Sequence, residues 1–148
     1  AAAVYAAPTG DDPQSKKKRE INAEVIRKEG LQAFAEARIP SYFSEQGNPE
    51  DISFAVELAK ETSAAGAIKA LYAMRNRPDE VAMLDSVDIP LLILRGKRDP
   101  WDGEFTTHSP SSFVTFADTE TSHMGMLDDP EQFLSVLNKW LQETSCHL

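Results

Sequence analysis

The stretch VDIPLLILRGKRDP, residues 87–100, decides the fold expected for this chain. Pro90 precedes four consecutive apolar residues, and Gly96 follows them closely. A short apolar run bounded by such breakers predicts a buried strand, and a run without polar alternation is typical of a parallel sheet covered on both faces. We therefore expect a strand within residues 87–96 and a loop after it that carries Asp99.

A second strand and a helix are expected downstream. The segment SSFVTFAD, residues 111–118, predicts the strand. Asp129 and Pro130 predict a helix start, and Gln132 occupies the position that a capping box requires. Apolar residues with helical spacing follow, which predicts a helix packed on the sheet. These residues are Phe133, Val136, Leu137, Trp140 and Leu141.

The first half of the chain predicts the end of a strand, within residues 3–6, and then several short helices. Helix-start signals occur at positions 12–13, 48–51 and 62–63, and Gly30 and Pro40 predict the ends of the first two helices. Strands that alternate with helices indicate an α/β sheet. The helical block is too long for a simple crossover. We expect a strand end and loop over residues 1–11, a helical lid or cap over 12–84 and a C-terminal α/β core segment over 85–148.

The composition excludes several classes of protein. The 148 residues carry a formal net charge of −9 at pH 7, which argues against broad binding to nucleic acids or anionic membranes. The basic run KKKR, residues 16–19, is interpreted as a solvated helix face. The single cysteine, Cys146, excludes an intrachain disulfide, and no apolar run is long enough to span a bilayer. We expect a cytoplasmic location.

Asp99 and His123 are the residues most suited to chemistry. Each follows one of the two predicted strands, and the carboxyl ends of parallel strands meet at one edge of a sheet. A carboxylate on one imidazole nitrogen fixes the tautomer, leaves the other nitrogen as a base and stabilises the imidazolium. Taken singly, Asp99 is more often a turn residue and His123 an ordinary loop histidine, so the prediction depends on their joint position.

The segments VDIPLLILRGKRDPW and FADTETSHMGMLDDPEQFLSVLNKWL resemble the C-terminal half of the α/β-hydrolase fold superfamily, in particular its esterase, enol-lactonase and haloperoxidase-like members. Gly96 and Asp99 match the G-x-x-D that follows an apolar strand in that family. His123 and the P-E-x-F beginning at Pro130 match its histidine segment. Ser122 departs from the glycine that many members have there, and the short interval between Asp99 and His123 suggests a trimmed helix.

The resemblance implies a triad of nucleophile, acid and histidine in that chain order, with the nucleophile on G-x-S-x-G before the lid. The 148 residues contain no such motif. Ser109, Ser111 and Ser112 lack the glycines of that turn and are interpreted as loop and strand-start residues. We therefore expect the nucleophile upstream of this chain, and the N-terminal half of the same fold, or a second chain supplying it, as partner. We expect this chain alone to be inactive.

The resemblance further implies hydrolysis of a small ester, lactone or similar acyl substrate, while haloperoxidase-like, epoxide hydrolase and dehalogenase activities stay open. Four residues are candidates for substrate binding: Trp101, Met124, Tyr42 and Phe43. We expect no cofactor, no metal site and no nucleic-acid or membrane partner, since the acidic residues and histidines match no metal template. The alternative function is a non-catalytic α/β interaction module or pseudoenzyme fragment.

Overall fold

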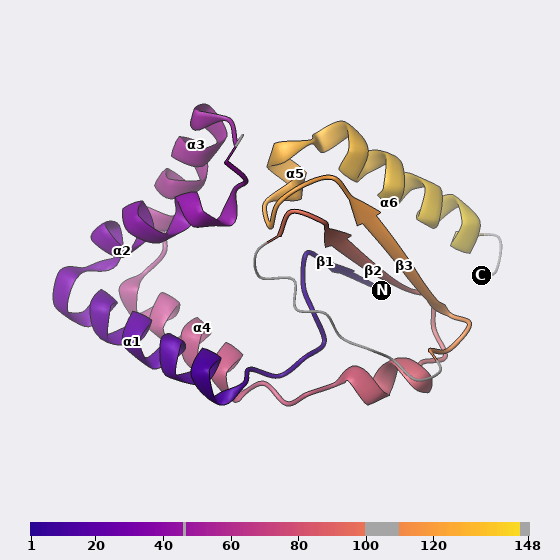
Figure 1. Cartoon of the computed structure of the whole chain (residues 1–148), viewed down its shortest axis with the longest axis horizontal. Coiled ribbons are helices and arrows are strands. Elements are labelled where there is room, and N and C mark those ends of the chain that lie inside the picture. Colours follow the sequence, from indigo (N-terminus) through magenta and orange to yellow (C-terminus); the bar gives the residue numbers. More distant parts are fainter. Residues whose placement is uncertain (46, 100–109, 146–148) are drawn as a thin grey trace. The chain divides into compact units, whose positions relative to one another are not determined.

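A three-stranded parallel sheet forms the centre of the larger of two compact units (Figure 1). The computed structural model describes residues 1–45, 47–99 and 110–145. The strands are β1 (Ala2–Val4), β2 (Leu91–Gly96) and β3 (Val114–Thr119), in the order β1-β2-β3. Leu92 pairs with both Ala2 and Thr115, so β2 is the middle strand. The predicted α/β class and the parallel pairing of the two later strands are confirmed.

The predicted strands begin later than their sequence signals. Pro90 lacks a backbone N–H and so cannot donate within a ladder, and β2 starts at the next residue. Before β3, the amide of Val114 donates to the carbonyl of Ser111 at 2.9 Å, and the amide of Ser111 donates to Leu84. The first bond closes a turn, which accounts for the polar residues at the start of the predicted segment, and the second ties this turn to Leu84.

Both faces of β2 are buried, as its unbroken apolar run predicts. Leu92 and Leu94 pack on one face in a cluster with Trp140 of α6 (Pro130–Ser145). Leu91 and Ile93 pack on the other face against Leu84 of the 3-10 helix η2 (Val81–Asp85), and this alternation follows from the two-residue period of a strand. Three partly buried residues of α6 pack against the Trp140 cluster: Phe133, Val136 and Leu137. Full burial of one leucine side chain stabilises the fold by about 1.5–3 kcal/mol.

The start of α6 differs from the expected capping box. The Asp129 carboxylate accepts a hydrogen bond from the amide of Gln132 at 2.9 Å, as predicted. The Gln132 side chain, however, accepts from the amide of Glu120 instead of returning to Asp129. It therefore ties the first turn of α6 to the segment after β3. The short helix α5 (Gly125–Asp128) directly precedes this cap.

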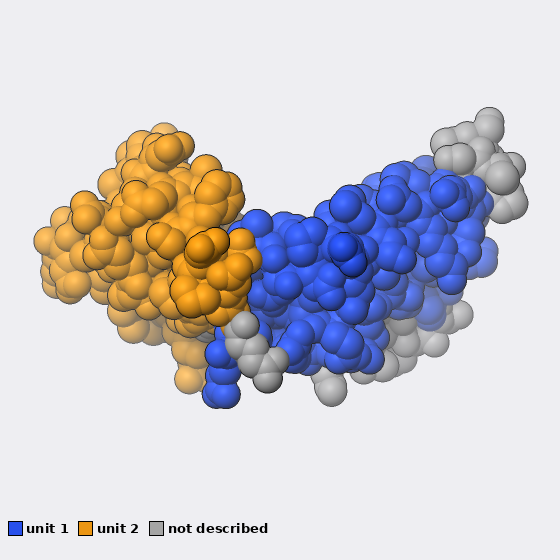
Figure 2. Space-filling view, turned by 90° about the horizontal axis from the view of Figure 1, so that it is seen from above, with its two compact units in different colours: residues 1–8, 42–46, 81–148 blue, residues 9–41, 47–80 orange. Residues whose placement is uncertain are grey.

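The second compact unit, residues 9–41 and 47–80 (orange in Figure 2), is helical (Figure 1). Its helices are α1 (Pro13–Glu29), α2 (Leu31–Arg38), α3 (Pro49–Lys60) and α4 (Ala64–Asn76). The 3-10 helix η1 (Ile39–Tyr42) follows α2, and its last residue, Tyr42, already belongs to the larger unit. Asp12, Asn48 and Ser63 cap three of them with their side chains. Gly30 adopts a φ of 90° between α1 and α2, a conformation that glycine takes without strain.

The core of the helical unit consists of Ala23 and Ile26 of α1 and Leu71 of α4. The predicted helix ends agree with the structure, because α1 stops before Gly30 and α2 stops two residues before Pro40. Within the described ranges of the chain, no helix is both long and apolar enough to cross a membrane.

Candidate active site

Asp99 and His123 form a hydrogen-bonded pair after the carboxyl ends of β2 and β3. Oδ2 of Asp99 lies 2.7 Å from Nδ1 of His123. The Asp99 side chain is 3% exposed and that of His123 is 34% exposed. The carboxylate is thus shielded from water while the imidazole stays accessible. Because Nδ1 is engaged by Asp99, Nε2 is the ring nitrogen left to accept or donate a proton.

Backbone hydrogen bonds continue beyond the two strands and bring the pair together. The amide of Lys97 donates to the carbonyl of Thr119 at 2.9 Å, and that of Arg98 donates to Thr121 at 3.0 Å. The amide of Asp99 then turns back to the carbonyl of Gly96 at 2.9 Å. The loop that carries the acid is therefore held along the segment that leads to the histidine.

Gly96 permits this close approach of the two loops. A Cβ atom at position 96 would lie 2.5 Å from the carbonyl oxygen of Ser122 and 2.6 Å from that of Thr121. Both of these atoms belong to the backbone and have little freedom to move aside. The glycine of the G-x-x-D motif therefore has a packing role that its sequence position alone does not reveal.

A further clamp holds the backbone next to the histidine. Oδ2 of Asp128 accepts a hydrogen bond from the amide of Ser122 at 2.7 Å. The Ser122 hydroxyl accepts one from the amide of Met124 at 3.2 Å, and Ser122 is fully buried. Asp128 is not among the site residues predicted from the sequence. The sequence signal for this role was weak, because an aspartate next to a helix start usually caps the helix.

The predicted substrate-binding residues have different surroundings. The ring centroid of Tyr42 lies 5.5 Å from that of His123, with the two planes tilted by 57°. Phe43 is buried at 6% exposure, and Met124 adjoins His123 and is half-buried. Trp101 lies outside the described residues. The structure therefore brings Tyr42 to the histidine, and substrate binding by all four residues stays a prediction.

The serines near the second strand lie away from the pair. Ser111 belongs to the turn before β3, where its hydroxyl accepts from the amide of Phe113 at 3.3 Å. His123 follows the opposite end of β3, and a strand of six residues is roughly 20 Å long. Ser111 is thus too distant to be activated by His123. Ser109 lies outside the described residues.

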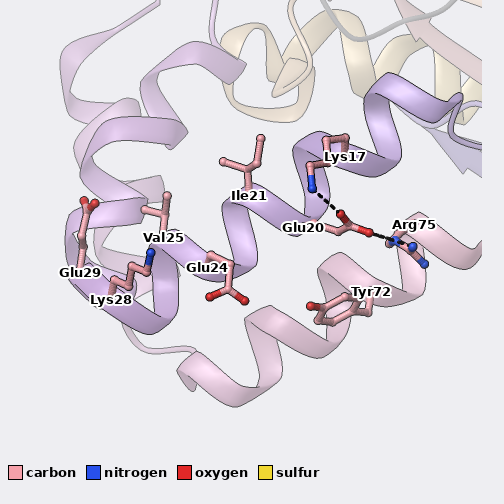
Figure 3. A pocket seen from close by; sticks show the side chains of 9 residues that line it. All are labelled: Lys17, Glu20, Ile21, Glu24, Val25, Lys28, Glu29, Tyr72 and Arg75. Atoms are coloured by element: carbon pink, nitrogen blue, oxygen red, sulfur yellow. Dashed lines mark hydrogen bonds and ion pairs between the residues drawn. The ribbon is translucent and has the colours of Figure 1, made fainter.

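A separate surface pocket in the helical unit lies between α1 and α4 (Figure 3). Three charged groups at this pocket pair with one another: Glu20 pairs with Lys17 at 3.1 Å and with Arg75 at 2.9 Å. The hydrogen bond from Lys17, followed by that from Arg75, lowers the pKa of the Glu20 carboxyl. Lys17 belongs to the basic run of the sequence and is exposed on α1. These paired charges are ordinary surface features of a helix pair.

No group of three or more histidine, cysteine, aspartate or glutamate side chains in the described part of the chain is arranged to hold a metal ion. Near the Asp99–His123 pair, Lys97 forms an ion pair with Glu120. The hydrogen bond that Lys97 donates to the Glu120 carboxylate raises the pKa of the Lys97 ammonium. At this edge of the sheet, the described residues bring together the Asp99 carboxylate and the His123 imidazole.

Comparison with known proteins shows which fold this is. No family model matches the sequence, and a search of curated proteins gave no match. Among solved structures, an esterase from Thermogutta terrifontis matches with a TM-score of 0.80 and 24% identity, over 97% of this chain and 55% of that one. The enol-lactonase from Burkholderia xenovorans LB400 matches with a TM-score of 0.75 and 18% identity, over 95% of this chain and 55% of that one. MenH from S. aureus matches with a TM-score of 0.72 and 18% identity, over 97% and 59%.

The chain has the α/β-hydrolase fold. It spans little more than half the length of the three structures named, so it corresponds to a part of that fold. The resemblance drawn from the segments around Asp99 and His123 is confirmed at the level of the fold. In open parallel α/β sheets, functional sites collect at the carboxyl edge of the strands, and this is where the pair lies.

Proposed function

We propose that the chain is the lid-containing C-terminal part of an α/β-hydrolase in which Asp99 and His123 are the acid and base of a catalytic triad. The observation that carries this proposal is the 2.7 Å hydrogen bond between a shielded carboxylate and an accessible imidazole after neighbouring parallel strands. The similar structures include proteins named as esterases and an enol-lactonase. A small carboxylic ester, lactone or similar acyl compound is therefore the proposed substrate.

In the proposed mechanism, His123 Nε2 removes the proton from the nucleophile as it attacks the acyl carbon. Asp99 holds the imidazole through Nδ1 and stabilises the imidazolium that forms. His123 then gives this proton to the leaving group, and in the second half of the reaction it activates water to release the covalent intermediate. Tyr42, which contacts the His123 ring, is the best placed of the proposed substrate-binding residues.

The nucleophile and the oxyanion hole are proposed to come from the N-terminal half of the fold, on the same polypeptide or on a second chain. Two observations support this partner. The 148 residues contain no G-x-S-x-G motif, and the similar structures extend well beyond the matched region. Within the described residues, β1 pairs on one side with β2 and with no strand on its other side. We propose that strands of the N-terminal half pair there.

The proposal is tested by labelling the protein with a fluorophosphonate and then measuring intact masses under denaturing conditions. We expect the label upstream of residue 1, on a longer polypeptide or a second chain, and its loss in the His123→Ala variant. Ser111→Ala is the matched control and should label normally. A label on a serine within these 148 residues would contradict the proposal. Absence of any label, together with unchanged ester hydrolysis in His123→Ala, would instead favour a non-catalytic module.

A further inference from the structure

Tyr5 occupies an unusual position directly after β1. Among the residues that the structure describes, it is the one non-glycine residue with a positive φ, at 49°. A bulky residue adopts this conformation only where its surroundings impose it. Its amide donates to the carbonyl of Leu94 at 2.8 Å, and its side chain is buried at 5% exposure. The backbone thus turns the ring inward at the carboxyl end of β1.

The hydroxyl of Tyr5 belongs to a buried hydrogen-bond network. It lies 3.1 Å from Oγ1 of Thr119 and 3.4 Å from Oγ1 of Thr121, and these threonine oxygens are 2.7 Å apart. Thr119 donates its single hydroxyl proton to the carbonyl of Arg95 at 3.2 Å. The proton of Tyr5 is therefore available for Thr119. The network joins the end of β1 to the ends of β2 and β3.

The ring of Tyr5 also contacts the chain beyond the histidine. A Cβ atom at Gly125 would lie 2.1 Å from Cζ of Tyr5, so the ring packs directly on the backbone there. Tyr5 consequently touches the segment that carries His123 on both sides. Thr121 is two residues before the histidine, and Gly125 is two residues after it.

We propose that Tyr5 is a positioning residue that holds residues 119–125 where Nδ1 of His123 meets Asp99. Its effect on catalysis rests on the function proposed above, whereas its effect on the hydrogen bond does not. Ordinary core packing is the competing explanation, because Tyr5 also contacts Phe133 with a centroid distance of 6.3 Å. The two explanations differ in what the hydroxyl does. Tyr5→Phe retains the ring and removes only the hydroxyl.

NMR of the complete protein with ¹⁵N-labelled histidine tests the proposal without requiring activity. In Tyr5→Phe, we expect the Nδ1–H resonance of His123 to move toward that of free histidine and its proton to exchange faster with water. Tyr72→Phe, which removes a tyrosine hydroxyl from the helical unit, should leave this resonance unchanged. If Tyr5→Phe keeps the wild-type resonance, the hydroxyl has no positioning role and the proposal is wrong.

Kinetics on the same variants measures the catalytic consequence. We expect Tyr5→Phe to lower kcat roughly tenfold at unchanged KM, since displacement of a reacting group by a fraction of an ångström has effects of this order. Thr121→Val removes one hydroxyl of the network and should shift the His123 resonance in the same direction. If Tyr5→Phe does not fold, this variant tests the positioning role instead. If the wild-type protein shows the Asp99–His123 resonance but hydrolyses no ester, the proposed function is wrong. The positioning role of Tyr5 is then tested by the NMR experiment alone.

Discussion

Oδ2 of Asp99 lies 2.7 Å from Nδ1 of His123, although 24 residues separate them in the sequence. Neither residue belongs to a strand. Each lies in a loop, and backbone hydrogen bonds join the two loops. The pair therefore depends on three features that can be changed one at a time: the carboxylate, the close approach at Gly96 and the clamp at Asp128.

Asp99→Asn tests the carboxylate. The amide keeps the size of the side chain but cannot stabilise an imidazolium as a charge, and it favours the wrong histidine tautomer. We expect kcat for ester hydrolysis by the complete protein to fall by roughly 10³–10⁴-fold with a small change in KM. Steady-state kinetics on a chromogenic ester gives both values.

Asp118→Asn is the matched control for that substitution. Asp118 pairs with Arg95 at 2.9 Å near the same edge of the sheet, and its side chain is 36% exposed. We expect it to change kcat less than twofold, because exposed ion pairs contribute little. A loss of less than tenfold in Asp99→Asn would contradict the role proposed for Asp99.

Gly96→Ala tests the approach of the two loops. Its methyl group would overlap the carbonyl oxygens of Thr121 and Ser122, so the backbone on one side must shift. We expect a loss of about 1–3 kcal/mol in the free energy of unfolding, which is typical of overpacking. Urea denaturation measures this loss, and the NMR resonance of His123 reports whether the pair separates.

Gly66→Ala in α4 is the control against which the stability loss of Gly96→Ala is compared. The added Cβ would lie 2.9 Å from the hydroxyl of Ser63, a side chain that can move. The helix preference of alanine, about 1 kcal/mol over glycine, offsets the disturbed cap. We expect a change near zero. Equal losses in the two variants would show that the loop contact at Gly96 has no special cost.

Substitution of Asp128 tests the clamp on the histidine segment. Asp128→Ala leaves the buried amide of Ser122 without its acceptor, which costs about 1–3 kcal/mol of folding free energy. Asp128→Asn keeps an acceptor oxygen and should lose much less. Thermal unfolding followed by circular dichroism measures both variants. The clamp is not needed if the alanine and asparagine variants unfold at the same temperature.

The cap of α1 predicts a pH dependence. The Ser15 amide, which donates to Asp12 at 2.7 Å, is the main cause of a lowered pKa of the Asp12 carboxyl. Because the pKa is lowered in the folded state, the stabilisation is present above the unfolded value of 3.8 and is lost as the pH falls through the folded value. Asp12→Asn keeps a capping oxygen that does not titrate.

Urea denaturation between pH 6 and pH 3 measures this effect. We expect the wild-type protein to lose more stability over this range than Asp12→Asn. Asn48→Asp, at the cap of α3, is the reciprocal control and should add acid sensitivity. Parallel curves for the wild type and Asp12→Asn would mean that the cap does not contribute to acid unfolding.

The sequence alone determined the helix starts and the buried strand. Asp12, Asn48, Ser63 and Asp129 cap helices through bonds to amides two or three residues away, so the signal is complete within a few positions. The apolar run before Gly96 likewise predicted a strand buried on both faces. The rule that parallel strands end at one edge was sufficient to expect Asp99 near His123.

Only the tertiary structure decided what surrounds the pair. Tyr5 contacts Thr121 across 116 positions, and Gln132 binds the amide of Glu120 instead of closing its own capping box. Such contacts join side chains to whichever backbone groups the packed strands bring near them. Local spacing and periodicity in the sequence do not predict these long-range contacts. The sequence therefore predicted the elements and the acid–histidine pair, while the arrangement that holds His123 in place follows from how β1, β2 and β3 pack together.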